Sequence, residues 1–241
     1  MEAHATLALI KVLRDWDWCA AEQEFNYTHE LNPGYAVAHQ WHAVFLRHMG
    51  RFVEALCEVD KAQALDPISP SIITTRALIL HYGERHEDAL MELERAFELE
   101  SDYPIAHFAR ALVNTQLQRY EEAISSFKTV SEILGTETAE VATNLAYVYA
   151  QMGRTIEAKG VLKQLLRRAK SEYISTYFIA TIYVGLNQID SAFEFLGKAD
   201  HARDIDLGKI KVDPCMMRLR VDPRFLSLLQ LLNLDFAEPE L

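Results

Sequence analysis

The sequence lacks most features that mark a secreted, metal-stapled or membrane-spanning protein. It has three cysteines in 241 residues, far apart and without a C-x-x-C pair, which excludes a disulfide framework or a zinc knuckle as the basis of the fold. No apolar run approaches the roughly 18 residues that cross a bilayer. The start, MEAHATLALI, has no charged n-region or cleavage site. We therefore expect no membrane insertion by this chain and a cytoplasmic location, although a parent protein could place it across a membrane.

Positive charge and catalytic motifs are also scarce. The chain has 24 Lys and Arg residues against 35 Asp and Glu residues, a formal net charge of −11. Because nucleic acids and anionic membranes are bound through basic patches, we predict no nucleic-acid partner. The sequence contains no Gly-rich phosphate loop, G-x-S-x-G elbow or H-E-x-x-H motif. We predict that the chain is not an enzyme and needs no cofactor.

Two interleaved series of alanines dominate what the sequence does contain. Members of each series are 34 or 35 residues apart; the first is Ala8, Ala43, Ala77, Ala111, Ala146 and Ala180, and the second is Ala21, Ala55, Ala89, Ala123, Ala158 and Ala192. A fixed period in this range indicates a solenoid built from one repeated supersecondary unit. The chain is therefore predicted to hold six such units.

Each unit is predicted to be a hairpin of two helices. In the second unit, residues 36–49 and 52–65 have apolar residues at helical spacing, Gly50 interrupts the pattern, and Pro67 ends the unit. Alanines at the crossing points allow the helices to pack closely. One turn after each second-series alanine is a larger apolar residue that should fill the space beside it: Phe25, Val59, Leu93, Phe127, Leu162 and Leu196.

The stretches Ala21-x-x-x-Phe25…Pro33 and Ala123-x-x-x-Phe127 resemble the tetratricopeptide repeat. The resemblance implies an all-α, right-handed solenoid of stacked helix hairpins, with six hairpins in residues 1–200 and capping helices with a short tail in residues 201–241. The sequence departs from the repeat pattern where the tryptophan of the first helix is missing. It also departs where Gln118 and Asn187 replace the turn glycine.

Both ends of the array differ from its middle. The first turn, RDWDW, is one residue longer than the others; we expect its aspartates to cap the next helix and Trp16 and Trp18 to lie over the hairpin end, with a ligand-binding loop as the alternative. Near the C-terminus, Val-Asp-Pro occurs twice and predicts two helix starts. We expect four residues there to cover the last repeat, and the tail FAEPEL to fray. These four are Phe225, Leu226, Leu229 and Leu232.

The stretches WDWCAAEQEF, LNPGYAVAHQWHA, LDPISPSI and VDPRFLSLL resemble repeat regions appended to bacterial transcriptional regulators and serine/threonine kinases. This resemblance implies a regulatory role. Because no effector domain is present in the sequence, we expect the chain to be an excised or truncated module of a larger protein.

Nine histidines suggest a metal site, above all His39-x-x-His42, which places two imidazoles on one helical face. The sequence shows no third ligand nearby, and His39 shares its repeat position with His107. We therefore predict that these histidines pack between repeats and bind no metal.

Resemblance to the repeat family also implies a concave groove lined by the first helix of each unit, where a protein or peptide partner would bind. The predicted contact residues are Gln40, Val44, Arg47, His48, Thr74, Leu78, His81, Tyr82, Phe108, Leu112, Thr115, Tyr147, Tyr177 and Thr181. Aromatic side chains would anchor a peptide and the polar groups would orient it.

Two alternatives to peptide binding remain open. One is a small-molecule sensor in which the groove closes on a ligand. The other is self-association, possible as a homodimer through the uncapped first helix, which carries Leu7, Leu9 and Ile10.

Overall fold

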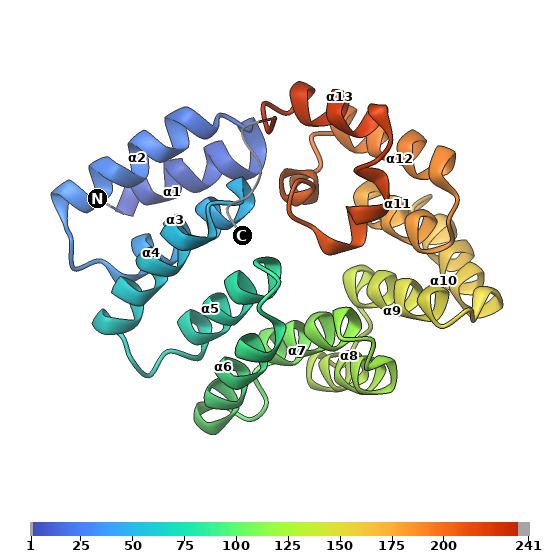
Figure 1. Cartoon of the computed structure of the whole chain (residues 1–241), viewed down its shortest axis with the longest axis horizontal. Helices are drawn as coiled ribbons and strands as arrows, with labels where there is room; N and C mark the ends of the chain where they lie inside the picture. The colour runs from blue at the N-terminus through green and yellow to red at the C-terminus, as the bar shows by residue number, and fades with distance from the viewer. Residues whose placement is uncertain (1, 236–241) are drawn as a thin grey trace. The chain divides into compact units, whose positions relative to one another are not determined.

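The computed structural model describes residues 2–235, and these residues form helices and turns without a strand (Figure 1). The predicted all-α solenoid of helix hairpins is thereby confirmed, while the tail FAEPEL lies outside the described residues. The paired helices are α1 (Glu2–Ile10) and α2 (Trp18–Leu31), α3 (Ala36–Met49) and α4 (Phe52–Leu65), α5 (Pro70–Tyr82) and α6 (His86–Leu99), α7 (Pro104–Gln116) and α8 (Tyr120–Leu134), α9 (Ala139–Gln151) and α10 (Thr155–Arg168), and α11 (Thr176–Gly185) and α12 (Ile189–His201).

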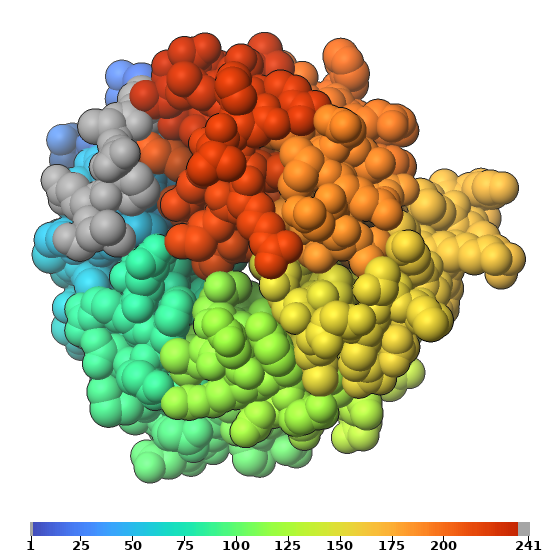
Figure 2. Space-filling model, turned by 45° about the vertical axis from the view of Figure 1, so that its right-hand side comes forward, coloured from blue at the N-terminus to red at the C-terminus, as the bar shows by residue number. Residues whose placement is uncertain are grey.

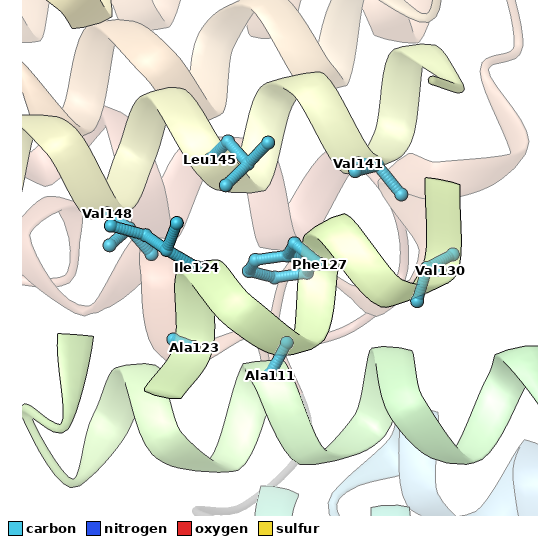
Figure 3. Packing of buried hydrophobic residues seen from close by; sticks show 8 residues of the cluster. All are labelled: Ala111, Ala123, Ile124, Phe127, Val130, Val141, Leu145 and Val148. Atoms are coloured by element: carbon cyan, nitrogen blue, oxygen red, sulfur yellow. The ribbon is translucent and has the colours of Figure 1, made fainter. Parts of the chain in front are cut away.

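The alanines lie where the helices approach most closely, as the sequence predicted. All twelve members of the two series are 0% exposed. Figure 3 shows one such contact: the ring of Phe127 lies between Ala111 of α7 and Leu145 of α9. The larger residues one turn after the second-series alanines are buried in every hairpin. Methyl side chains at the crossing points thus leave the space that these larger side chains fill.

The hairpin turns repeat one left-handed backbone position with the period of the alanines. Its φ angle is 52° at Trp16, 78° at Gly50, 62° at Glu84, 59° at Gln118, 76° at Gly153 and 56° at Asn187. Only glycine adopts this conformation without a steric penalty. Three hairpins after the first therefore carry a side chain where the turn favours glycine.

The longer first turn is accommodated as a π-helix, η1 (Lys11–Asp15), which continues α1. Hydrogen bonds in a π-helix span one residue more than those in an α-helix, so this turn accommodates the extra residue. Asp17 caps α2 as predicted, because its side chain accepts a hydrogen bond from the backbone N–H of Ala20 at 3.1 Å. Trp16 and Trp18 are each only 4% exposed.

The described residues divide into two compact units. Unit 1 holds residues 2–106, 208–212 and 227–235, and unit 2 holds residues 107–207 and 213–226. The segment after α12, which contains η2 (Ile205–Lys209), η3 (Pro214–Leu219) and α13 (Pro223–Leu231), therefore contributes to both units. In Figure 2 its red surface lies beside the orange surface of α11 and α12. Whether residues 1–200 and 201–241 act as separate domains stays a prediction.

Both Val-Asp-Pro stretches begin helices, as predicted. Asp213 accepts a hydrogen bond from the N–H of Cys215 at 2.8 Å, and Asp222 accepts one from the N–H of Arg224 at 3.0 Å. The helix after Asp213 is a 3-10 helix rather than an α-helix. An Asp before a Pro thus starts a helix here but does not decide its type.

The predicted covering face at the C-terminus is wrong in three of its four members, because Leu226 is exposed and Leu229 and Leu232 belong to unit 1, not to the unit of the last repeat. Phe225 is buried in unit 2, but Leu226 is 55% exposed. Leu232 is buried in unit 1, where its carbonyl accepts a hydrogen bond from Trp18 Nε1 at 2.8 Å. Leu228 takes the place of Leu226, because residues three and four positions apart share one face of a helix. The C-terminal residues therefore also cover the first hairpin and its tryptophans.

Candidate partner-binding surface

The fourteen predicted contact residues all lie on first helices of hairpins, namely α3, α5, α7, α9 and α11. The buried ones are Arg47, His48, Thr74, His81, Thr115, Tyr147, Tyr177 and Thr181. The half-buried ones are Gln40, Val44, Leu78, Tyr82, Phe108 and Leu112. Residues up to Tyr82 belong to unit 1 and those from Phe108 onward to unit 2, and each group is described within its own unit.

In unit 1 the surface centres on a buried cation. Arg47 is 8% exposed, and its guanidinium carbon lies 4.8 Å from the centre of the Tyr82 ring. Arg47 Nη2 lies 3.0 Å from His48 Nε2. Arg47 Nε has no hydrogen-bond partner, and within residues 2–235 no carboxylate pairs with this guanidinium. An aromatic face and an imidazole therefore hold a charge that usually requires an anion when it is buried.

Two buried histidines border this cation. Burial lowers the pKa of His81 to about 3, with smaller contributions from His86 and Arg47. Burial and the Arg47 charge hold the pKa of His48 well below its usual range. Both imidazoles are thus neutral at pH 7, and in each of them Nδ1 has no hydrogen-bond partner, as is also true of Thr74 Oγ1.

We call Arg47, His48, Thr74, His81 and Tyr82 the unit 1 polar face. Val44 and Leu78, which are half-buried on the same helices, add apolar surface beside it. Four of the five polar-face residues hold a buried polar atom that the described protein does not satisfy. This face therefore has unmet hydrogen-bonding capacity.

Gln40 differs from these residues because its amide is already engaged. Gln40 Nε2 lies 2.8 Å from both Ser71 Oγ and Thr75 Oγ1, to which it donates. These bonds connect α3 to α5. Gln40 thus fixes the spacing of two first helices in unit 1.

In unit 2 the chain itself satisfies the predicted residues of α11. The Tyr177 hydroxyl donates to Asp213 Oδ2 at 2.6 Å. Asp204 Oδ2 accepts from Ser175 Oγ at 2.8 Å and from the Tyr177 N–H at 3.2 Å. The Thr181 hydroxyl donates to the Tyr177 carbonyl at 3.0 Å. The inner side of α11 is therefore occupied by the chain's own C-terminal segment.

The same segment covers the predicted residue of α9. Tyr147 is 7% exposed, and burial raises its pKa, with smaller contributions from Cys215 and Asp213. Gly185 of α11 allows the close approach of these helices, because a Cβ there would lie 3.0 Å from Tyr147 Cδ2 and 3.2 Å from Ala150 Cβ. A partner could reach this part of unit 2 only by displacing residues 213–218.

The predicted residues of α7 mainly serve packing. Phe108 lies edge-on to Phe127 with ring centres 5.5 Å apart, and both Phe108 and Leu112 pack against the hydrophobic cluster of Figure 3. The Thr115 hydroxyl donates to the Ala111 carbonyl at 2.8 Å. Among the predicted contact residues, only those of unit 1 hold buried polar atoms without a hydrogen-bond partner; in unit 2 such atoms occur on Thr143, Gln151 and Thr176, which are not among them.

The histidines predicted to pack between repeats do so. The His39 ring of α3 stacks on His29 of α2 with centres 4.1 Å apart, and the His42 ring stacks on Phe25 at 4.9 Å. The structure also adds Glu58 of α4, whose Oε2 lies 2.7 Å from His39 Nδ1. The sequence missed this grouping because its members come from three helices and share no local motif.

No helix within residues 2–235 combines the length and the apolar character that crossing a bilayer requires.

Comparisons with known proteins agree on the fold. Residues 74–130 and 139–172 match models of the tetratricopeptide repeat. No curated protein matches the chain as a relative. The solved structure of PilW, a type IV pilus biogenesis factor, matches with a TM-score of 0.62 and 13% identity over 90% of this chain and 97% of PilW.

Two further structures match at similar levels. The solved structure from a functional characterisation of Pseudomonas aeruginosa pilF matches with a TM-score of 0.58 and 18% identity, over 86% of this chain and 94% of the pilF chain. A tetratricopeptide repeat protein from Parabacteroides merdae gives a TM-score of 0.57 and 17% identity, over 98% of both chains. At these identities the likeness shows the fold alone. The chain thus contains tetratricopeptide repeats, which generally act as non-catalytic protein-interaction scaffolds.

Proposed function

We propose that this chain, which carries tetratricopeptide repeats, is a non-enzymatic module that binds a protein or peptide on the first helices of unit 1 and serves a bacterial regulatory or signalling protein. The regulatory context is supported by the resemblance of its LDP and VDP stretches to the repeat regions of such regulators. The binding role is supported by the family, and the choice of unit 1 by the structure.

The observation that carries the choice of unit 1 is the unmet hydrogen-bonding capacity of its polar face. Each buried polar atom without a partner costs about 1–3 kcal/mol of stability. A partner that brings acceptors to Arg47 and His48 recovers part of this loss if their side chains turn toward it, because the unpaired atoms are themselves buried. Val44, Leu78 and Tyr82 provide apolar and aromatic contact area beside the polar atoms.

Unit 2 supports the same choice by contrast. Its inner tyrosine on α11 already bonds to Asp213, and its inner serine bonds to Asp204. Binding there would first break these hydrogen bonds, which charged acceptors make stronger than ordinary ones. Binding at unit 1 breaks no such bond to Arg47 Nε.

The non-enzymatic role agrees with the origin of the perturbed histidines. Burial is the main cause of the lowered pKa values of His42, His48 and His81. Burial of this kind stabilises a neutral packed ring and does not itself activate a nucleophile. Together with the missing sequence motifs, this favours binding over catalysis.

Capture of the partner from extracts of the source cells tests the proposal. We expect Leu78→Lys and Val44→Lys to abolish capture, because each replaces apolar contact area on α5 or α3 by a charged side chain that a partner would have to desolvate. The matched controls are Val53→Lys and Met91→Lys on α4 and α6, where the native side chains are 57% and 62% exposed. Equal capture by all four variants would reject unit 1 as the binding surface.

Self-association is a second candidate, and one observation favours it. Leu7 and Ile10 of α1 are 39% and 45% exposed, so the first helix presents apolar surface. A second copy of the chain would cover this surface in a symmetric dimer. Light scattering over a dilution series distinguishes the candidates: a dimer that Leu7→Lys dissociates supports self-association, and a monomer at the highest concentration rejects it.

A further inference from the structure

The histidine and glutamate side chains at the junction of α2, α3 and α4 form a cluster that the proposed function does not use. Its members are His29 of α2, His39 and His42 of α3, and Glu58 of α4. Their side chains are 17%, 5%, 8% and 12% exposed in that order. We propose that His29, His39 and Glu58 of this cluster bind a divalent zinc-like metal ion. This replaces the expectation from the sequence that no metal binds, because His29 and Glu58 supply ligands that the sequence around His39 does not show.

The ligand atoms of His29, His39 and Glu58 lie close enough together for one ion to contact all three, with His42 beside them. Glu58 Oε2 lies 2.7 Å from His39 Nδ1, 3.7 Å from His29 Nε2 and 3.8 Å from His42 Nδ1. The two nitrogens His29 Nε2 and His42 Nδ1 are 3.1 Å apart. Ligands about 2.0–2.1 Å from a tetrahedral zinc ion are roughly 3.3 Å from one another, which lies within this range.

His29, His39 and Glu58 form the core of the site, since their three ligand atoms all lie within 4.8 Å of one another. His42 Nδ1 lies 3.1 Å from His29 Nε2 and 3.8 Å from Glu58 Oε2, beside this core, but it does not belong to the group of three. Two imidazoles with one carboxylate favour zinc and the later first-row divalent ions, whereas magnesium and calcium prefer sites made of oxygen atoms.

Neighbouring groups orient the ligands. His39 Nε2 donates to the Pro33 carbonyl at 2.9 Å, which leaves Nδ1 facing the cluster. Lys61 Nζ lies 2.7 Å from Glu58 Oε1 and holds the carboxylate so that Oε2 faces the imidazoles. A backbone carbonyl on the outer nitrogen of a histidine is a common second-sphere arrangement at metal sites.

An ion has a path to the cluster. His29, His39 and Glu58 line an open hollow of about 800 Å³, which Asn26, Glu30, Pro33, Lys61, Ala64 and Leu65 complete. Both ring nitrogens of His39 face acceptors, so a proton lies between His39 Nδ1 and Glu58 Oε2 in the metal-free chain. A bound ion replaces this proton, which leaves to solvent.

The first repeat contains a natural control for this site. His4 Nδ1 lies 2.7 Å from Glu24 Oε2, the same pairing of a first-helix histidine with a second-helix glutamate. The group of three or more metal-ligating side chains found among residues 2–235 is the one at Glu58 and does not include His4. The His4–Glu24 pair therefore has the repeated histidine–glutamate contact without a second histidine ligand, and serves as the control for metal binding.

Zinc binding to the full chain tests the proposal, with Zn²⁺ competed against a chromophoric chelator and Mg²⁺ as the comparison ion. We expect one Zn²⁺ per chain for the wild type and for His4→Ala, and no binding of Mg²⁺. His29→Ala should weaken zinc binding at least about 100-fold, because a ligand is lost. His29 is the variant of choice, because its hydrogen bond is to the His42 side chain, whereas His39 also bonds to the backbone at Pro33.

Two further measurements keep the test decisive. Co²⁺ in the wild type should show the intense visible absorption of a tetrahedral site, and Glu58→Gln should lose it. Zn²⁺ should raise the Tm of the wild type and of His4→Ala, but not of His29→Ala, whose circular dichroism should stay helical. Absence of zinc binding by the folded wild type, or equal binding by the wild type and His29→Ala, would overturn the proposal.

Discussion

The two units differ in how the polar groups on their first helices are hydrogen-bonded. Both carry polar and aromatic residues on the first helices of their hairpins. In unit 2, Tyr177, Ser175 and their neighbours are bonded to Asp204 and Asp213 of the chain's own C-terminal segment. In unit 1, Arg47 Nε and three other buried polar atoms of the polar face have no such partner. Unit 2 also has buried polar atoms without a partner, on Thr143, Gln151 and Thr176, but none of these belongs to its predicted contact residues. In unit 1, by contrast, three of the four polar-face residues that carry such atoms contain or flank the Arg47 charge.

The contrast explains how a repeat array becomes asymmetric without losing its period. The alanine contacts and the left-handed turn residues recur in both units. What differs is the segment that follows α12, which brings buried carboxylates to unit 2. We infer that unit 2 is a preformed scaffold and that unit 1 is the part adapted for binding, at some expense of stability.

The largest expected effect concerns the completed surface. Asp204→Ala removes the acceptor of the Ser175 hydroxyl and of the Tyr177 N–H. Because both donors stay buried, we expect a loss of about 3 kcal/mol in the free energy of unfolding, measured by urea denaturation. The control is Asp190→Ala, whose side chain is 94% exposed. A loss from Asp204→Ala no larger than that from the control would show that the segment does not complete unit 2.

An effect of opposite sign is expected in unit 1. Arg47→Met replaces a buried cation that has no carboxylate partner by an apolar side chain of similar length. We expect the free energy of unfolding to rise by about 1–3 kcal/mol while partner capture is lost. Arg85→Met is the control, because Arg85 is exposed and pairs with Asp88, so a change below about 0.5 kcal/mol is expected. A marked loss of stability from Arg47→Met would contradict the comparison.

A smaller effect is expected in the pH dependence of the free energy of unfolding, through His81 of unit 1. The pKa of His81 is lowered to about 3 in the folded chain, against about 6.5 when unfolded. Below the unfolded value, the unfolded chain binds a proton that the folded chain does not. The stability contributed by neutral His81 is therefore present near pH 7 and declines by about 1 kcal/mol on reaching about pH 5.5. In His81→Gln this part of the pH dependence should disappear from urea unfolding; an unchanged slope would refute the burial of a neutral ring.

The smallest effect, the gain in stability from glycine at the left-handed turn position, should be equal in the two units. Glu84 in unit 1 and Gln118 in unit 2 occupy the same left-handed turn position, with φ of 62° and 59°. Replacing either residue by glycine should raise Tm through a gain of up to about 1 kcal/mol. Unequal gains would show that the turns, and not only the C-terminal segment, separate the two units.

The sequence predicted those parts of the molecule that repeat. A methyl side chain at a helix crossing is a local requirement, so the alanine period was sufficient to find the hairpins. The caps at Asp17 and Asp213 were likewise predictable, because a cap acts within three residues.

The remaining features depend on contacts between distant residues. Nothing in the stretch around Asp204 indicates that it bonds to Ser175, because the period has ended and the pairing is set by tertiary packing. The approach of His29 and Glu58 to His39 likewise joins three helices at unrelated spacings. Leu226 was misplaced because an apolar residue near a helix start is compatible with either face of the helix.

Photo-crosslinking from two positions of the full chain tests the difference between the units most directly. A photoreactive phenylalanine analogue replaces Tyr82 in unit 1 or Tyr147 in unit 2 in living cells, and mass spectrometry identifies what each captures. Position 82 should capture another protein, and position 147 should capture residues 213–218 of the same chain. Capture of a foreign protein at position 147, with none at position 82, would contradict the division between a completed and a binding surface.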